Sequence, residues 1–190
     1  MRRRQLIKPD HFHYRHQDGA LLIEVLVAML LLSFGMFSLG AMMSFSVQMP
    51  KLSGYRSTAV NLASSYIDRI RANPAGFSAY EKPLRENAWS FEKIERKDCK
   101  YPDCNETSLA LMDDAAVRQA VRDALPAGDL LMRCDTTPCN KNSHGNLWIV
   151  WQEPVTHEKL DTSSWDNCPL EAEKIYTQPK PRCMYVGFKV

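Results

Sequence analysis

Six cysteines are the side chains of this 190-residue chain with the clearest capacity for chemistry. They stand at Cys99, Cys104, Cys134, Cys139, Cys168 and Cys183. The first four form two pairs with the same C-x4-C spacing. An even number of cysteines in an oxidising compartment indicates disulfides, whereas closely spaced thiolates can instead ligate zinc. The compartment of this part of the chain therefore decides between the two chemistries.

An apolar run near the N-terminus indicates the compartment in which the cysteines lie. No charged residue occurs after Glu24 until Lys51, and the run Ala20–Val47 exceeds the about 20 residues that a helix needs to span a bilayer. Residues 1–19 hold five of the 24 Lys and Arg residues and two of the 22 Asp and Glu residues, so the remainder is nearly neutral. Because basic flanks remain cytoplasmic, the pattern predicts a cytoplasmic N-terminus and an exported body. A buried core helix is the alternative, and it would not need the basic leader.

Export favours three disulfides. Six cysteines allow fifteen pairings, and the sequence does not choose among them. We favour local closure of the two short loops and a bridge between the last two cysteines, which gives the pairs Cys99–Cys104, Cys134–Cys139 and Cys168–Cys183. A zinc site built from the two short pairs is the alternative.

The other chemistry-bearing residues form no catalytic constellation. The sequence has no Gly-rich phosphate loop, no G-x-S-x-G elbow and no H-E-x-x-H pair. The leader histidines could suggest a metal, but we interpret them as part of a polar segment that is later removed; they are His11, His13 and His16. We interpret His144 as a turn residue and His157 as a surface residue. The sequence therefore predicts no enzyme, no metal site and no cofactor.

Two charged clusters have simple structural interpretations. Asp113 and Asp114 are adjacent, so on a helix they do not face one another as a catalytic pair, and a place near a helix start suits them better. The best basic cluster is interleaved with acidic residues, which predicts a solvated mixed surface and leaves nucleic-acid binding as the less favoured alternative. Its basic members are Lys93, Arg96, Lys97 and Lys100.

Glu24 and Gly19 distinguish two explanations of the apolar run. An ordinary signal peptide could be cut after Ser38-Leu39-Gly40, where small residues stand at the required positions. A carboxylate costs about 2.5–3.5 kcal/mol at a bilayer centre, however, and less near the interface. The apolar pattern also continues past Gly40 as far as Val47, which such a cut would leave on the mature chain.

The stretch "GALLIEVLVAMLLLSFG", from Gly19 to Gly35, resembles the N-terminal signature of type IV pilin-like proteins. The resemblance implies that a prepilin peptidase cuts on the cytoplasmic side directly after Gly19. Ala20 would be the new, usually N-methylated, N-terminus, and Glu24 matches the family's glutamate at the fifth mature position. One departure is that the family often begins with Phe or Met, where this chain has Ala.

Within the family, the sequence of this stretch is most similar to that of minor pilins of the PilV type. This implies a structural subunit of the type IV pilus, in the bacterial inner membrane with a periplasmic head and then in the fibre. The implied partners are other pilins through the N-terminal helix, the prepilin peptidase and the inner-membrane assembly machinery. A pseudopilin of a type II secretion system is the first alternative. A periplasmic enzyme or binding domain on a signal anchor is the second.

The resemblance implies a role for Glu24 in assembly. The carboxylate stands one helical turn after the amine that cleavage creates at Ala20, and isolated charges are costly in a low dielectric. When helices pack with a stagger, the amine of one subunit can meet the carboxylate of another, which relieves both costs. The alternative is that Glu24 lies at the headgroup interface and pairs with nothing.

The expected fold is α+β, with a long N-terminal helix on a small antiparallel sheet that carries disulfides. We expect a leader at 1–19, an apolar half of the helix at 20–50, an amphipathic half at 51–74 and a periplasmic globular head at 75–190. Pro50 is expected to kink the helix, and Asn73-Pro74-Ala75-Gly76 to end it. The apolar stripe of the second half recurs at helical spacing. It comprises Leu52, Tyr55, Ala59, Leu62, Ala63, Tyr66, Ile67 and Ile70.

The sequence of the head predicts several strands and one helix. The pattern predicts a helix over Asp113–Leu125 and a weak strand over Trp89–Ile94. It also predicts strands over Leu130–Cys134, Asn146–Gln152 and Met184–Val190. Trp148 and Trp151 should lie on opposite faces of their strand. Residues 152–183 give no clear pattern.

Overall fold

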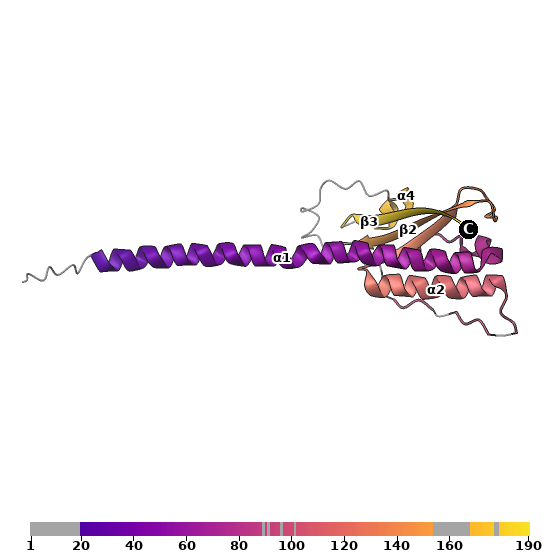
Figure 1. Ribbon diagram of the computed structural model, residues 1–190, viewed down its shortest axis with the longest axis horizontal. Coiled ribbons are helices and arrows are strands. Elements are labelled where there is room, and N and C mark those ends of the chain that lie inside the picture. Colours follow the sequence, from indigo (N-terminus) through magenta and orange to yellow (C-terminus); the bar gives the residue numbers. More distant parts are fainter. Residues whose placement is uncertain are drawn as a thin grey trace, which may run out of the picture. The chain divides into compact units, whose positions relative to one another are not determined.

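The computed structural model describes residues 20–88, 90, 92–95, 97–100, 102–153, 168–176 and 179–190. The chain divides into two compact units, residues 1–46 and 47–190. We call the second unit the body. The elements, in chain order, are α1 (Ala20–Ala72), the 3-10 helix η1 (Pro74–Tyr80), α2 (Glu106–Ala124), β1 (Asp129–Cys134), β2 (His144–Gln152), α4 (Leu170–Ile175) and β3 (Pro181–Lys189) (Figure 1).

Helix α1 is a single helix of 53 residues that belongs to both units. Pro50 lies inside it and does not end it. The helix stops at Ala72, immediately before Asn73-Pro74, as the sequence predicts, because proline disfavours helical backbone in the residue that precedes it. Arg69 and Arg71 stand in its last turn, where cations interact favourably with the helix dipole.

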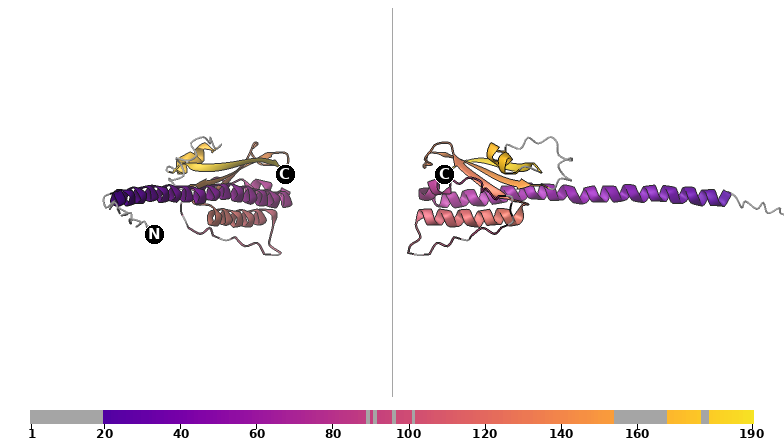
Figure 2. Two further views of the ribbon diagram at one scale, coloured as in Figure 1. Left: turned by 60° about the vertical axis from the view of Figure 1, so that its left-hand side comes forward. Right: turned by 180° about the vertical axis from the view of Figure 1, so that it is seen from behind.

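The second half of α1 packs through the predicted stripe. Ala59, Ala63, Tyr66, Ile67 and Ile70 are buried, and the remaining three residues of the stripe are partly buried. They share one core with η1, α2 and the inner face of the sheet. Figures 1 and 2 show α2 on one side of this part of α1 and the sheet on the other. The prediction of an amphipathic half that packs on the body is confirmed.

The sheet is antiparallel, in the order β1-β2-β3. Its inner face contributes Leu147, Ile149 and Trp151 to the main core, whereas Val150 belongs to a smaller core under α4. Trp148 lies on the outer face, with its ring 5.1 Å from that of Tyr185. The two tryptophans of β2 thus occupy opposite faces, and the expected α+β architecture is confirmed.

Three disulfides close local loops of the body. They are Cys99–Cys104, Cys134–Cys139 and Cys168–Cys183. The second closes the turn after β1, and the third ties the residue before α4 to β3. No cysteine is left as a free thiol, so the four sulfurs of the alternative zinc site are bonded to one another in pairs.

The structure corrects the predicted start of the second helix. α2 begins at Glu106, where the side chain of Asn105 caps it by accepting a hydrogen bond from the Ser108 backbone N–H at 2.8 Å. Asp113 and Asp114 therefore lie in the middle of the helix rather than near its start, and both are buried. The prediction failed because acidic residues are common in the first turn of a helix, so the two aspartates resemble a start although apolar residues, Leu109–Met112, precede them.

The weak strand predicted over Trp89–Ile94 is wrong for the residues that the structure describes, which are 90 and 92–94. None of these four is in a strand. The Ile94 backbone N–H donates instead to the Gln119 side chain of α2 at 2.8 Å. The backbone N–H of Ile94 is thus bonded to a side chain and not to the backbone of a neighbouring strand.

The strands β2 and β3 start earlier than the sequence predicts. His144 is the first residue of β2 rather than a turn residue, and its backbone N–H donates to the Asp135 carboxylate at 2.8 Å. β3 starts at Pro181, and α4 lies in the stretch 152–183, which shows no clear pattern in the sequence. His157 and the three leader histidines lie outside the described residues.

A buried arginine joins the parts of the body. Arg118 of α2 donates from Nε to Asp114 at 2.9 Å and from Nη1 to Asp129 of β1 at 2.8 Å. Its Nη2 donates to the Pro83 carbonyl at 3.1 Å. Tyr66 of α1 donates to the same Asp114 carboxylate at 2.9 Å. One guanidinium thus links the second half of α1, α2 and the sheet.

A second carboxylate fixes the end of α1. Asp113 accepts hydrogen bonds from Arg69 at 2.7 Å and from the Tyr80 hydroxyl of η1 at 2.8 Å. Asn73, just after α1, donates to the Glu106 carbonyl at the start of α2 at 2.7 Å. The adjacent aspartates of α2 therefore both hold α1, Asp114 through Tyr66 and Asp113 through Arg69.

Burial shifts the ionisation of these groups. Burial, with the nearby Asp114 carboxylate, raises the pKa of Tyr66 well above its usual range, and burial likewise raises the pKa of Tyr80 and Tyr176. Burial alone would lower the pKa of Arg118, but the neighbouring Asp114 and Asp129 carboxylates outweigh it and raise that pKa. The arginine is therefore charged and the tyrosines are neutral at physiological pH.

Arg118→Leu should destabilise the body by about 3–5 kcal/mol, because it leaves the Asp114 and Asp129 carboxylates buried without their cation. Urea unfolding of the full chain in detergent measures this change. Lys97→Leu is the matched control, because the Lys97–Glu95 pair at 3.1 Å is exposed and should contribute little. Equal unfolding curves for the two variants would contradict the role of Arg118.

Stability should fall as the pH rises above about 10, the ordinary pKa of tyrosine. The folded body keeps the protons of its buried tyrosines, whereas the unfolded chain releases them, so alkaline pH favours unfolding. Urea midpoints at about pH 9 and about pH 11 measure the loss. Tyr66→Phe removes one such group and should show a smaller loss between the two conditions. A loss as large as that of the unmodified chain would rule out Tyr66 as a contributor.

Candidate functional site

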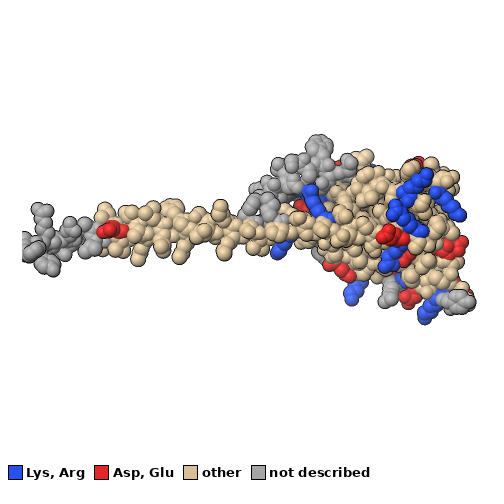
Figure 3. Space-filling model, viewed as in Figure 1, with Lys and Arg blue, Asp and Glu red and all other residues tan. Residues whose placement is uncertain are grey.

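The exposed first part of α1 is the feature of the molecule that most requires a partner. Leu22–Ser44, 23 residues long, is long and apolar enough to cross a membrane. Within the unit to which it belongs, none of this segment is buried, and Phe37 is 81% exposed. Figure 3 shows this part of the helix without Lys or Arg side chains. So much apolar surface must be covered by lipid or by other helices.

Backbone and hydroxyl groups of this segment are compatible with an apolar surrounding. The α-helix pairs its own N–H and C=O groups, as a membrane requires. Ser33 donates from its hydroxyl to the Met29 carbonyl at 2.6 Å, and Ser38 donates to the Gly35 carbonyl at 2.9 Å. These two hydroxyl donors are therefore satisfied within the helix itself.

Glu24 is the one charged side chain between Ala20 and Pro50. It lies in the second turn of α1, and its side chain is exposed. Ala20 is the first residue of the helix, so the proposed new amine and the carboxylate are separated by about one turn. Gly19, the residue before the proposed cut, lies outside the described residues.

The basic cluster of the body does not concentrate positive charge. Lys93, Lys97 and Lys100 are exposed, and Lys97 pairs with Glu95 at 3.1 Å. Arg96 lies outside the described residues. The described members are therefore consistent with a mixed, solvated surface.

A groove of the body, about 810 Å³, lies between α2 and the residues Lys82–Asn87, Lys93–Glu95 and Lys97. The described residues that line it include no histidine, cysteine or serine. Its Asp114 carboxylate already accepts from Tyr66 and Arg118, so it is not available as a base. The other carboxylates of the lining, Glu86 and Glu95, are exposed, and Glu95 pairs with Lys97 at 3.1 Å.

Sequence reasoning missed the groups that hold the body together. Arg118 and Asp129 are separated along the chain, and no motif marks them as partners. The sequence carries only a weak sign of them. Arg118 is a charged residue on the apolar side of its helix, beside Val117 and Val121, and such a position hints at a buried charge. Only a packed structure identifies which carboxylate each one meets.

Comparison with known families now adds an independent observation. A family model described as Tt1218-like, type IV pilin Tt1218, matches residues 41–115. Over these residues the chain is similar to type IV pilins. No curated protein and no solved structure matched the chain.

The match lies mostly in the first half of the body. It begins inside the apolar segment of α1 and ends inside α2, next to the Asp113 and Asp114 carboxylates. The three-stranded sheet lies outside the matched residues. The family and the exposed apolar helix together fit a membrane-anchored pilin subunit.

Proposed function

We propose that this chain is a minor pilin of a type IV pilus. It is made as a precursor, is cut after Gly19 by a prepilin peptidase, and joins or primes the filament from the inner membrane. The observation that carries the proposal is the exposed apolar helix that begins at Ala20 and holds one carboxylate, Glu24. The likeness to type IV pilins supports it.

The physical basis is the cost of two isolated charges. Cleavage leaves an amine or methylamine at Ala20 at the start of an apolar helix, with Glu24 about one turn further on. In a bundle of such helices, an axial stagger places the amine of one subunit against the carboxylate of its neighbour. A buried charge that lacks its partner is strongly destabilising, so this pairing favours one axial register over others.

A pseudopilin of a type II secretion system is the second candidate, because such a protein would have the same N-terminal features. The three disulfides of the body fit the pilin alternative somewhat better. Expression of the chain in cells that assemble only one of the two systems separates these candidates. An enzyme or binding domain on a signal anchor is the third candidate, and the likeness to type IV pilins over residues 41–115 gives it less support.

The N-terminus of the mature protein is the first measurement. We expect intact mass and terminal peptide sequencing to give a start at Ala20 that carries one additional methyl group. Gly19→Val should abolish this cut, because a side chain replaces the hydrogen at the cleavage position. Gly35→Val is the matched control: it adds the same side chain within the helix, where no other group lies within 4 Å.

A start at Ala41 would instead establish a conventional signal peptide and would overturn the pilin proposal. An uncut Met1 would leave a signal anchor.

Glu24→Gln should leave cleavage and membrane retention intact and lower incorporation into sheared filaments at least about tenfold, equivalent to about 1.4 kcal/mol. The amide keeps the size of the side chain but cannot neutralise the amine of a neighbour. Quantitative immunoblots of sheared material measure the change. Glu173→Gln, on the exposed surface of α4, is the control. Unchanged incorporation of the Glu24 variant would support the alternative, in which the carboxylate lies at the headgroup interface and pairs with no amine.

A further inference from the structure

The two edges of the sheet use their backbone groups differently. Antiparallel strands pair through alternate residues, so every second residue of an edge strand points its N–H and C=O away from the sheet. Such a row of groups is a template for another strand, and proteins usually block it. One edge of this sheet is blocked, whereas the described part of the other is open.

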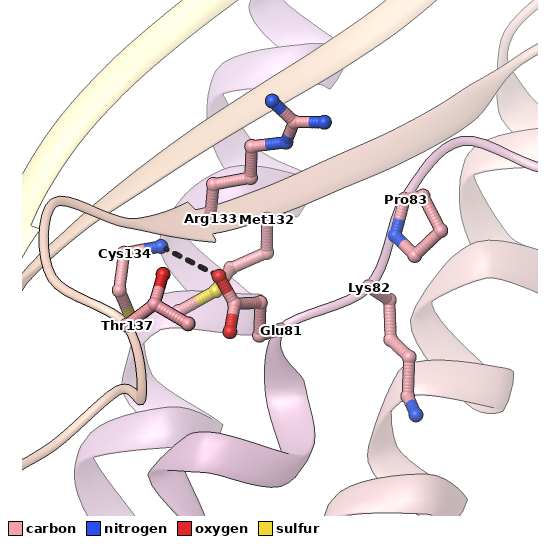
Figure 4. Close-up of a pocket in the computed structure, with 7 residues that line it drawn as sticks. All are labelled: Glu81, Lys82, Pro83, Met132, Arg133, Cys134 and Thr137. Carbon is pink, nitrogen blue, oxygen red and sulfur yellow. Dashed lines mark hydrogen bonds between the residues drawn. The ribbon is translucent and has the colours of Figure 1, made fainter.

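The β1 edge is blocked by three different acceptors. Its outward N–H groups belong to Leu130, Met132 and Cys134. The backbone of Lys82 exchanges two hydrogen bonds with Met132, at 3.0 and 3.1 Å. The Glu81 carboxylate accepts from the Cys134 N–H at 3.4 Å, as Figure 4 shows, and the Asp129 carboxylate accepts from the Leu130 N–H at 2.9 Å. No further strand can add on this side without displacing them.

The direction of the β3 groups follows from the register. The Gln152 N–H donates to Pro126 on the β1 side of β2, so the odd-numbered residues of β2 face β3. Their partners in β3 are even-numbered: Leu147 pairs with Val186 and Ile149 with Met184. The outward residues in the second half of β3 are therefore Tyr185, Gly187 and Lys189. Arg71 donates to the Lys189 carbonyl at 3.4 Å, which agrees with this direction.

These three residues form an open edge. Among the described residues, no backbone or side-chain acceptor receives the N–H of Tyr185, Gly187 or Lys189. All three residues are exposed. The first half of the strand differs, because Cys183 is bonded to Cys168, whose sulfur lies 3.6 Å from the Pro181 carbonyl oxygen. The open edge thus begins at Tyr185.

We propose that the β3 edge from Tyr185 to Lys189 receives an extended segment of a neighbouring pilin-like subunit as a fourth strand. This inference rests on the proposed function, because it takes the neighbour from the filament. Backbone groups in a row at strand spacing are matched by an extended backbone and not by a helix face.

The side chains along the edge define the segment that fits. Tyr185 stacks near Trp148 on the outer face, so an apolar or aromatic side chain fits beside it. The exposed Lys189 carries positive charge at the far end, where a carboxylate of the partner fits, whereas the nearby Arg71 lies 3.9 Å from the Asp68 carboxylate of its own helix. The partner segment therefore combines an apolar residue near Tyr185 with an acidic residue near Lys189.

A second β3 strand is not the expected occupant. Two identical edges pair about a two-fold axis and run antiparallel, which would turn the α1 helices of the two subunits in opposite directions. Helices anchored in one membrane share a direction. The contact is therefore between different surfaces of neighbouring subunits.

Gly187→Pro tests the edge directly. Proline removes the outward N–H of residue 187 and leaves the bonds to β2 in place, because those belong to residues 184, 186 and 188. We expect incorporation into sheared filaments to fall at least tenfold. Gly187→Ala is the matched control: it keeps the N–H, and its added Cβ would lie 3.1 Å from the Tyr185 hydroxyl, an end that can move. Equal incorporation of the two variants overturns the proposal.

Residue-resolved amide exchange of the unmodified full chain decides the question independently, even if the proline variant folds poorly. In detergent, the amides of Tyr185, Gly187 and Lys189 should exchange fast, while those of Met184 and Val186 are protected by β2. In assembled filaments all five should be protected. Outward amides that remain fast in filaments of a chain processed at Ala20 would overturn this proposal and leave the proposed function standing. A chain that is not cut after Gly19 would overturn both.

Discussion

The constraint on which this molecule depends is the apolar surface of the first part of α1. A helix that exposes Leu22–Ser44 without burying any of it in its own unit cannot stay in water. Under the proposed function, lipid covers this helix before assembly, and the helices of other subunits cover it in a filament. The chain therefore needs a body that holds the other end of the same helix firmly, because any fraying there would weaken both arrangements.

The body meets this need with buried charge rather than with apolar contact alone. The stripe of α1 supplies the apolar contact, but the Tyr66 hydroxyl reaches Asp114, and Asp114 shares Arg118 with Asp129 of the sheet. Apolar packing is not directional and tolerates sliding, whereas a guanidinium between two carboxylates is satisfied in one geometry. The network therefore specifies how α1 lies against α2 and the sheet.

The two edges of the sheet differ in whether their outward backbone N–H groups meet an acceptor within the described part of the chain. Glu81 and Lys82, which follow η1, close the β1 edge with one carboxylate and one stretch of backbone. The β3 edge ends in Tyr185, Gly187 and Lys189, whose outward groups meet no acceptor in the described part of the chain. A subunit built for a repeating array needs surfaces that differ from one another, since identical ones would close a pair and stop growth.

The sequence by itself determined the features that depend on neighbours along the chain. The uncharged run after Glu24, the stripe from Tyr55 to Ile70 and the β-rich segment before Gln152 each carry a local period, and each became the expected element. The structure also contains disulfides at the short cysteine spacings, where loop closure is local.

Only the tertiary structure decided where α2 begins, which carboxylate Arg118 meets and which sheet edge is closed. The two aspartates of α2 looked like a helix start because charge is common there, and their burial depends on Tyr66 and Tyr80, more than 30 residues away in the chain. Edge protection likewise depends on Glu81 lying beside Cys134. Such contacts are set by how distant segments pack, and no local pattern encodes them.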